Sequence, residues 1–281
     1  MTDVIVTGAT GFIGKALVQR LLHMGVKAIP LGSLDGDVAE AATWESLPKV
    51  AAVVHLAGRS YVPDSWSDGA SFIRTNVLGT EQALAYCRRQ GARLVYVSAY
   101  VYGIPSELPI AETHPIMPNN PYALSKRMAE QLCEFASRFQ GVSVTVLRIF
   151  NVYGPGQRPE FLIPSIIRQV KEGKEIRVMD LKPRRDFVYL DDVVDAIVKA
   201  LSVTQGFNLV NIGSGKSLSV EEIIGCIQAA AGTDLPVVSE ATERPQEIPD
   251  VRADITLAKR VLGWAPQLSF LSGINRLLNV E

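Results

Sequence analysis

Asp3-Val-Ile-Val-Thr7-Gly8-Ala-Thr-Gly11-Phe-Ile-Gly14 is a short β-branched run followed by three evenly spaced glycines. Apolar residues then recur with a helical period, at Ala16, Leu17, Leu21 and Leu22. This order of strand, glycine turn and helix is that of a dinucleotide-binding unit. In such a unit Gly8 permits the tight turn, Gly11 lets the backbone approach a pyrophosphate, and Gly14 lets the helix pack on the strand. The helix N-terminus adds amide donors, and an ordinary tight turn is the alternative.

The composition is that of an ordinary globular chain. Its 281 residues suffice for one large α/β domain, or for a main domain with a smaller lobe. The net charge of -1 gives no indication of nucleic-acid or membrane-surface binding. No apolar run reaches the roughly 18 residues of a membrane-spanning helix, and the chain opens on a strand-like segment rather than a signal peptide. We therefore expect a cytoplasmic location.

Neither the cysteines nor the histidines show the spacing of a metal site. The cysteines lie singly in helical-looking segments, and we expect all three to be buried thiols: Cys87, Cys133 and Cys226. The histidines are scattered along the chain, so we expect structural roles for them and no metal: His23, His55 and His114.

The second repeat of the fold is predicted to be truncated. Residues 26–31 form its strand, and Pro30 cannot donate to a ladder, so this strand should lie at or next to a sheet edge. Residues 32–49 are too few for a normal strand-helix repeat. We expect residues 34–38 to pass under the adenine of the cofactor, with Asp37 accepting its amino group and Val38 in contact. A solvated turn is the alternative.

The end of this second strand lacks the acid that accepts the adenosine ribose hydroxyls of NAD. Gly32 and Ser33 stand there instead. With no charge to repel a 2′-phosphate, and with Ser33 able to bond to one, we expect NADPH to be used at least as well as NADH. Lys27 and Arg59 are the nearest basic residues in sequence, and Gly32→Asp should shift the preference towards NADH.

Two further buried strands lead into the predicted site. Residues 50–56 run into small residues, as expected where a chain passes close to a cofactor, and Leu56, Ala57 and Gly58 are candidate contacts. Residues 93–98 end with Ser98 at the carboxyl edge of the sheet, where open α/β folds place ligands. Between them, Thr75-Asn76 is predicted to begin a helix.

Residues 121–126, Pro-Tyr-Ala-Leu-Ser-Lys, read as the first turns of a helix that follows a proline-rich loop over residues 107–120. Four-residue spacing places Tyr122 and Lys126 on one helical face. A nearby ammonium favours phenolate over phenol, so we expect Lys126 to lower the pKa of Tyr122 and to make it a catalytic acid. A plain surface helix is the alternative.

Together these motifs resemble the extended short-chain dehydrogenase/reductase family of nucleotide-sugar epimerases, dehydratases and reductases. The resemblance runs nearly end to end and rests on Thr7–Gly14, His55-Leu-Ala57, Ser98-Ala-Tyr-Val-Tyr-Gly103, Tyr122-x-x-x-Lys126, Arg148-Ile-Phe-Asn151-Val-Tyr-Gly-Pro155 and Arg185-Asp-Phe-Val-Tyr-Leu-Asp191. It implies a doubly wound parallel α/β sheet (Rossmann) with a smaller, interleaved C-terminal substrate lobe. Residues 1–155 would bind the dinucleotide, with 185–215 returning to that domain, and 156–281 would mainly bind the nucleotide sugar.

The resemblance also implies the site residues. Ser98, Tyr122 and Lys126 form the catalytic set, and Asn76 matches a position that supports the lysine. Arg185 and Arg244 match positions that grip the substrate diphosphate. The remaining substrate contacts are Tyr100, Asn151 and Glu247, the last at the nucleoside ribose. The NAD or NADP contacts are Gly8, Thr10, Gly11, Phe12, Ile13, Gly14, Ser33, Asp37, Val38, Leu56, Ala57, Gly58, Asn76, Tyr122 and Lys126.

One departure from the family pattern narrows the expected reaction. The 4,6-dehydratases of the family carry acidic residues just after the catalytic hydroxyl, whereas this chain has Ala99 and Tyr100. We therefore expect hydride transfer at C4 of a nucleoside-diphosphate sugar. A 4-ketoreductase using NADPH is slightly favoured over a 4-epimerase that keeps NAD bound. A non-catalytic dinucleotide sensor or scaffold is the third possibility, and the resemblance implies a homodimer formed through a helix bundle.

Overall fold

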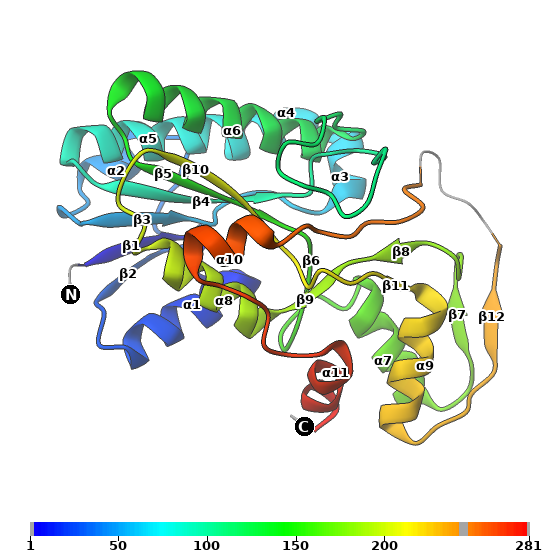
Figure 1. The fold of residues 1–281 in the computed structure, drawn as a ribbon. Helices are drawn as coiled ribbons and strands as arrows, with labels where there is room; N and C mark the ends of the chain where they lie inside the picture. Colours follow the sequence, from blue (N-terminus) through cyan, green and yellow to red (C-terminus); the bar gives the residue numbers. More distant parts are fainter. Residues whose placement is uncertain (1–2, 242–246, 280–281) are drawn as a thin grey trace.

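The computed structural model describes residues 3–241 and 247–279, and a six-stranded parallel sheet forms its centre (Figure 1). The strands lie in the order β10-β5-β4-β3-β1-β2, and every neighbouring pair is parallel. In chain order their bounds are β1 (Val4–Thr7), β2 (Ala28–Leu31), β3 (Ala52–His55), β4 (Arg93–Ala99), β5 (Val144–Ile149) and β10 (Phe207–Ile212).

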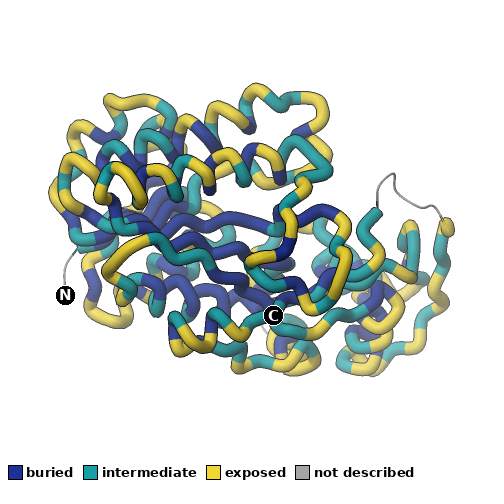
Figure 2. The backbone as a smooth tube through the Cα atoms, turned by 45° about the horizontal axis from the view of Figure 1, so that its top comes forward, coloured by how far each residue is buried: buried dark blue, intermediate teal, exposed yellow. Residues whose placement is uncertain are grey.

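Helices cover both faces of this sheet (Figures 1 and 2). One face packs against α1 (Phe12–His23), α8 (Leu190–Ala200) and α10 (Thr256–Leu262). The other packs against α2 (Ala41–Glu45), α5 (Gly79–Gln90) and α6 (Pro121–Gln140). Because neither face meets water, central strands are buried along their whole length, as all six residues of β5 are. The predicted doubly wound α/β fold is confirmed.

The second repeat is truncated, as the sequence predicts. The described chain between β2 and β3 forms a single short helix, α2. β2 lies at the sheet edge beside β1, where Pro30 pairs with Val6. The next strand, β3, lies on the opposite side of β1. The chain therefore reverses its direction across the sheet between β1 and β3, which is the place where open α/β sheets bind ligands.

The helical segment after β3 begins earlier than the sequence suggested. It consists of α3 (Val62–Ser67), α4 (Gly69–Phe72) and a π-helical turn, η1 (Ile73–Leu78), which continues directly into α5. Asp68 caps α4 by accepting a bond from the amide of Ser71. The expectation that Thr75-Asn76 begins a helix is therefore wrong, because these residues lie inside the π-turn. Such turns widen a helix and often occur at functional sites.

A smaller lobe lies at the right of Figure 1, beyond the carboxyl ends of β4 and β5. Its helices α7 (Leu162–Glu172), α9 (Val220–Ala231) and α11 (Phe270–Leu278) share one apolar cluster that includes Ile166, Ile223 and Ile274. Three two-stranded sheets complete it: β6 (Asn151–Tyr153) with β9 (Phe187–Tyr189), β7 (Ile176–Val178) with β12 (Val237–Ser239), and β8 (Arg184–Arg185) with β11 (Leu218–Ser219). Between its parts the chain returns to the main sheet through α8 and β10.

The structure shows how far each cysteine is buried and whether any described helix could span a membrane. Cys87 and Cys133 are buried, but Cys226 is only half-buried, so the prediction of three buried thiols is wrong for Cys226. It lies on α9 of the small lobe, where the helix packs on one side only. In the part of the chain that the structure describes, no helix has the length and apolar character needed to cross a bilayer.

The packing of α1 on β1 gives a testable consequence. A Cβ atom at Gly14 would overlap the Gly8 carbonyl oxygen and lie 2.8 Å from the Ala9 Cα. We expect Gly14→Ala to lower the free energy of unfolding by about 1–3 kcal/mol, because the tight turn must shift. Gly225 lies exposed inside α9 with open space around its Cα. Gly225→Ala should instead raise stability by about 0.5–1 kcal/mol. Urea denaturation of both variants checks this, and equal effects would contradict it.

Candidate active site

The glycine turn and the loop after β3 meet at the reversal point of the sheet. Gly8 has a positive φ of 65°, and a Cβ on it would lie 2.8 Å from the amide nitrogen of Ala57. The Thr7 hydroxyl oxygen accepts bonds from the amides of Leu56 at 3.2 Å and Ala57 at 3.0 Å. The N-cap residue of α1 is Gly11, which has no side chain to occupy the first amides of the helix. This cradle fits a pyrophosphate group.

The end of β2 carries an acid that the sequence did not reveal. The chain turns back after Gly32, whose amide donates to Asp35 Oδ2 at 2.7 Å. That oxygen lies 3.5 Å from where a Cβ of residue 32 would stand. The premise that no charge stands here is therefore wrong, since Asp35 supplies one from three positions further on. The same Cβ would lie 2.8 Å from Thr10 Cγ2, so Gly32→Asp would require the exposed Thr10 side chain to shift.

The segment expected at the adenine is ordered by its own contacts. Asp37 accepts a hydrogen bond from the backbone amide of Ala39 at 2.9 Å and forms an ion pair with Arg74 at 3.0 Å. This hydrogen bond and the Arg74 guanidinium hold the pKa of Asp37 below its usual value. Val38 is buried against Gly79. Arg74 is thus a basic group at this segment that the sequence analysis missed.

The two basic residues named from the sequence are engaged elsewhere. Lys27 precedes β2, at the opposite end of the strand from Gly32, and pairs with Asp3 at 3.1 Å. Arg59 pairs with Asp68 at 3.2 Å and lies over the ring of Phe72. We therefore assign neither of them to the cofactor phosphate.

The start of helix α6 carries the predicted catalytic residues Tyr122 and Lys126. The Asn120 side chain caps it by accepting from the amide of Ala123, and Pro121 occupies its first turn, as the sequence predicts. Lys126 is buried, donates from Nζ to the Val97 carbonyl at 2.6 Å, and lies 4.4 Å from the centre of the Tyr96 ring. Burial lowers the pKa of Lys126 to about 8, opposed by the carboxylate of Glu130. This contact joins the start of α6 to the end of β4.

Tyr122 does not have the lowered pKa that its spacing from Lys126 predicts. Its side chain is half-buried, with its ring packed at an angle against Phe72, and burial raises the pKa of the phenol above its ordinary value. The reason is that the Lys126 ammonium is turned towards the Val97 carbonyl and the Tyr96 ring. Tyr122 therefore keeps its proton at neutral pH, which suits a proton donor.

Asn76 lies beside this helix without bonding to the lysine in the contacts that the structure describes. It donates from Nδ2 to the Ser125 hydroxyl at 2.8 Å and accepts at Oδ1 from the amide of Arg59 at 2.8 Å. Asn76 therefore ties the loop after β3 to α6 through the residue before Lys126. Because Asn76 lies in the π-helical turn, its side chain lies between the loop after β3 and α6.

Ser98 is buried near the end of β4 and donates to the carboxylate of Glu130 at 2.6 Å. Glu130 is itself held by Arg148, which lies opposite Ser98 on β5. Glu130 continues the four-residue spacing of Tyr122 and Lys126 along the helix, but it is not among the site residues predicted from the sequence. That spacing was the signal that could have found it.

The predicted substrate residues differ in the contacts that they make within the protein. Arg185 and Glu247 form an ion pair with each other, and Arg185 also donates to the Ile248 carbonyl at 2.6 Å. Tyr100 donates to the Gly103 carbonyl at 2.6 Å, and Asn151 donates to the Asp186 carbonyl at 3.3 Å. Arg244 lies outside the described residues. The structure thus brings Arg185 and Glu247 together at the edge of the small lobe.

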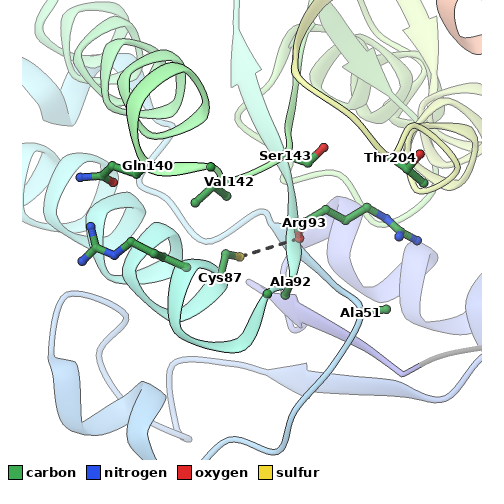
Figure 3. Close-up of a pocket in the computed structure, with 11 residues that line it drawn as sticks. Ala51, Cys87, Ala92, Arg93, Gln140, Val142, Ser143 and Thr204 are labelled. Atoms are coloured by element: carbon green, nitrogen blue, oxygen red, sulfur yellow. Dashed lines mark hydrogen bonds between the residues drawn. The ribbon is translucent and has the colours of Figure 1, made fainter.

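A pocket of about 300 Å³ lies elsewhere, between the ends of α5 and α6 (Figure 3). Cys87, Arg93, Val142 and Thr204 are among its lining residues, and the Cys87 thiol contacts the Arg93 carbonyl at 3.8 Å. Arg93 begins β4 whereas Ser98 is next to its end, so this pocket is at the opposite edge of the sheet from the candidate site. It is not part of the candidate active site.

A glycine cradle at the reversal point of a parallel sheet, with Ser98 and Lys126 buried at the carboxyl end of β4, is typical of a dinucleotide-dependent α/β enzyme. Residues 4–213 match the NAD dependent epimerase/dehydratase family. The chain belongs to this family and is an NAD(P)-dependent enzyme, so the predicted family and the prediction of an enzyme are confirmed.

Curated relatives named for three different reactions have similar sequence identities to this chain. A GDP-6-deoxy-D-mannose reductase of Pseudomonas aeruginosa is 33% identical, covering 98% of this chain and 95% of the relative. A dTDP-glucose 4,6-dehydratase of Streptomyces griseus is 33% identical, with 97% and 92% covered. A UDP-glucose 4-epimerase of Azospirillum brasilense is 30% identical, with 97% and 90% covered.

Two solved structures with similar folds contain different cofactors, NADPH in one and NAD in the other. The structure named RMD from Pseudomonas aeruginosa, complexed with NADPH, has a TM-score of 0.91 and 32% identity, covering 99% of this chain and 98% of its own. MoeE5, in complex with UDP-glucose and NAD, has a TM-score of 0.89 and 32% identity, with 97% and 96% covered. The expectation of NADP or NAD as the cofactor is confirmed at this level.

The buried Lys126 should make stability depend on pH in a defined direction. Its pKa is about 8 in the folded chain against the ordinary 10.5, so below pH 8 the folded protein holds a proton that burial disfavours. This destabilisation, about 3 kcal/mol, vanishes above pH 10.5, where neither state keeps the proton. We expect Lys126→Met to raise the free energy of unfolding by about 1–3 kcal/mol at pH 7, since the lost bond to Val97 offsets part of the gain.

The same comparison at higher pH tests the cause. At pH 9.5 the gain should fall by more than about half, as the wild-type lysine is then largely neutral in the folded state. Lys174 is exposed, so Lys174→Met removes the same ammonium without relieving burial and should change stability by less than about 0.5 kcal/mol. A gain that is equal at both pH values would show that charge burial is not its source.

Proposed function

We propose that this protein transfers a hydride at C4 of a nucleoside-diphosphate sugar without eliminating water. One observation carries the proposal. Lys126, on the same helix as Tyr122, is bonded to the end of β4, and this strand end has no carboxylate at positions 99 and 100. The three curated relatives are named for reactions on GDP, dTDP and UDP sugars, which supports this class of substrate.

The residue in the dehydratase acid position cannot serve as a base. Tyr100 donates its only hydroxyl proton to the Gly103 carbonyl, and burial raises its pKa despite the nearby Arg185 guanidinium. Ala99 has no titratable group. Abstraction of a proton next to the C4 carbonyl needs a base near neutral pH, so elimination is not supported by these two side chains.

The chain's own residues can perform the remaining steps. Tyr122, which keeps its proton, donates it to the sugar C4 oxygen when a ketone is reduced, and the tyrosinate so formed accepts the alcohol proton in the reverse direction. Ser98 hydrogen-bonds the same oxygen, and Lys126 binds the ribose of the nicotinamide half. When bound, the nicotinamide supplies or accepts the hydride. Residues 8–14, Asp37, Val38 and 56–58 would hold the rest of the dinucleotide.

The small lobe is the proposed sugar-nucleotide site. Arg185 and Arg244 would bind the diphosphate, because guanidinium groups form paired bonds to phosphate oxygens. Glu247 would bind the nucleoside ribose, with Tyr100 and Asn151 near the sugar. In the structure Glu247 pairs with Arg185, so substrate binding must exchange this ion pair for contacts with the ligand. Residues 1–155, with 185–215, would form the dinucleotide domain, and most of 156–281 the sugar-nucleotide lobe.

Two versions of this reaction have separate support. A 4-ketoreductase is supported by the similarity to the Pseudomonas aeruginosa reductase over nearly the whole chain. A 4-epimerase, which keeps NAD bound and reduces the keto sugar from its other face, is supported by Asp35 at the end of β2. Both versions would use NAD(H), since Asp35 opposes a 2′-phosphate.

We also propose a homodimer formed through α5 and α6. Four large apolar side chains are exposed along one face of α6, opposite the face that packs on the sheet: Leu124, Met128, Phe135 and Phe139. Leu78 is exposed next to the start of α5. An apolar stripe of this length on a water-facing helix is typical of an interaction surface.

The role of Tyr122 can be tested with a single atom removed. Tyr122→Phe deletes the proton donor and leaves the ring in place, so we expect kcat to fall by about 10²–10⁴-fold with KM nearly unchanged. NADH oxidation with the 4-keto-6-deoxy sugars of dTDP and GDP, and conversion of UDP-glucose to UDP-galactose, measure the two versions. Tyr86→Phe is the matched control, because Tyr86 lies on α5 with its side chain buried and its hydroxyl donates to the Pro48 carbonyl.

The same assays separate the competing functions. Equal activity of Tyr122→Phe and wild type would mean that Tyr122 is not the acid. An epimerase should retain NAD through purification, whereas a reductase should release its cofactor in every turnover, so the mass of any co-purified dinucleotide distinguishes them. A protein that binds a dinucleotide and turns over none of these sugars would instead support the sensor or scaffold role.

The cofactor preference gives a second test. Removing the charge with Asp35→Asn should raise kcat/KM for NADPH relative to NADH by about 10- to 100-fold, because repulsion of the 2′-phosphate is relieved. Asp234 is an exposed acid of the small lobe, and Asp234→Asn changes the net charge equally. It should leave the ratio unchanged. An Asp35→Asn ratio equal to that of wild type would place the adenosine ribose away from this turn.

A further inference from the structure

Glu130 is a buried carboxylate that the proposed reaction does not use. It lies on α6, one turn beyond Lys126, and is almost completely shielded from solvent. Its Oε1 accepts from the Ser98 hydroxyl at 2.6 Å and from Arg148 Nε at 2.9 Å. Its Oε2 accepts from Arg148 Nη2 at 2.7 Å and from Arg127 Nη1 at 3.2 Å. Both of its oxygens therefore accept charge-assisted hydrogen bonds from guanidinium groups.

This contact fixes the direction of a hydrogen bond at Ser98. Oε1 of Glu130 already accepts from Arg148 Nε, so it is an acceptor in the 2.6 Å contact and the serine is the donor. A serine hydroxyl has one proton and two lone pairs. While its proton points to Glu130, Ser98 has only lone pairs left for a ligand, and it can meet a sugar only as an acceptor.

We propose that Glu130 is a positioning residue that makes Ser98 an acceptor and so adapts the site to the hydroxyl form of the sugar. This inference rests on the proposed function. An alcohol at C4 can donate its proton to Ser98, while Tyr122 donates to the same C4 oxygen. A ketone at C4 has no proton to give, so Ser98 must leave Glu130 before it can bind the keto oxygen. The resting site thus binds an alcohol at C4 in preference to a ketone.

A substitution of similar shape should reverse this preference. In Glu130→Gln the amide oxygen should occupy the place of Oε2, where donors from both Arg148 and Arg127 meet it. The amide nitrogen then takes the place of Oε1, where it donates to Ser98 but can no longer accept from Arg148 Nε. With its oxygen now accepting from the glutamine, Ser98 can turn its own proton to the ligand. The variant should therefore gain affinity for the ketone relative to the alcohol.

The test compares paired ligands on the full-length protein. Dissociation constants are measured by calorimetry, without added dinucleotide and in a Tyr122→Phe background so that any retained dinucleotide supports no turnover, for dTDP-glucose with dTDP-4-keto-6-deoxyglucose and for GDP-mannose with GDP-4-keto-6-deoxymannose. The ratio of the ketone constant to the alcohol constant should fall at least tenfold in Glu130→Gln. Differences between the paired sugars at C6 cancel, because only the change of this ratio between variants is read.

Further variants separate positioning from structure. In a Ser98→Ala background, Glu130→Gln should leave the ratio within about threefold, because the effect acts through the serine. Glu134→Gln removes the carboxylate one turn further along α6, which pairs with Arg138, and should not change the ratio. If Glu130→Gln does not fold, Ser98→Ala alone should weaken the alcohol about tenfold and leave the ketone nearly unchanged.

Each outcome is decisive. A Glu130→Gln variant that weakens both ligands equally would overturn the inference, since a purely structural role lowers both affinities together. An equal ratio change with and without the Ser98 hydroxyl would also overturn it. If the wild-type protein binds neither member of either pair, the proposed function itself fails, and the inference fails with it.

Discussion

The arrangement of the candidate site depends on one buried ion pair, between Glu130 of α6 and Arg148 of β5. Both side chains are almost fully shielded, and two bonds join them. Removing either partner would leave an unpaired charge in the core, which is strongly destabilising. Because Ser98 lies opposite Arg148 in the sheet register, the same pair fixes the serine, the helix and the strand end together. The position of Tyr122 follows from that of α6.

The other half of the site depends on backbone rather than on charge. Gly8 and Ala57 approach so closely at the reversal point of the sheet that a side chain at position 8 would overlap the next loop. The hydroxyl of Thr7 holds that loop through two amides. A turn built this way exposes amide groups without side chains in front of them, which is what a pyrophosphate requires. The cradle and the start of α6 then lie at the same edge of one parallel sheet.

Much of the fold could be read from local patterns. The strand-turn-helix order, the glycine spacing and the Tyr122-Lys126 spacing act over a few residues, so they survive without knowledge of the rest of the chain. Pro30 likewise predicted an edge strand, because a missing amide donor is a local fact. The start of the helix at Thr75 was not predictable in this way. Its π-turn continues from α4, which the Asp68 cap begins.

The sequence by itself determined the family, the sheet with its truncated second repeat, and the residue types at the strand ends. Only the tertiary structure decided how those residues are charged and connected. Asp35 reaches Gly32 because the chain turns back. Lys126 turns to a backbone carbonyl, so burial and not its charge governs the pKa of Tyr122. Glu130 meets Ser98 across a helix-strand contact. Spacing along a chain predicts which side chains share a face, but solvation and partners are set by what packs against that face.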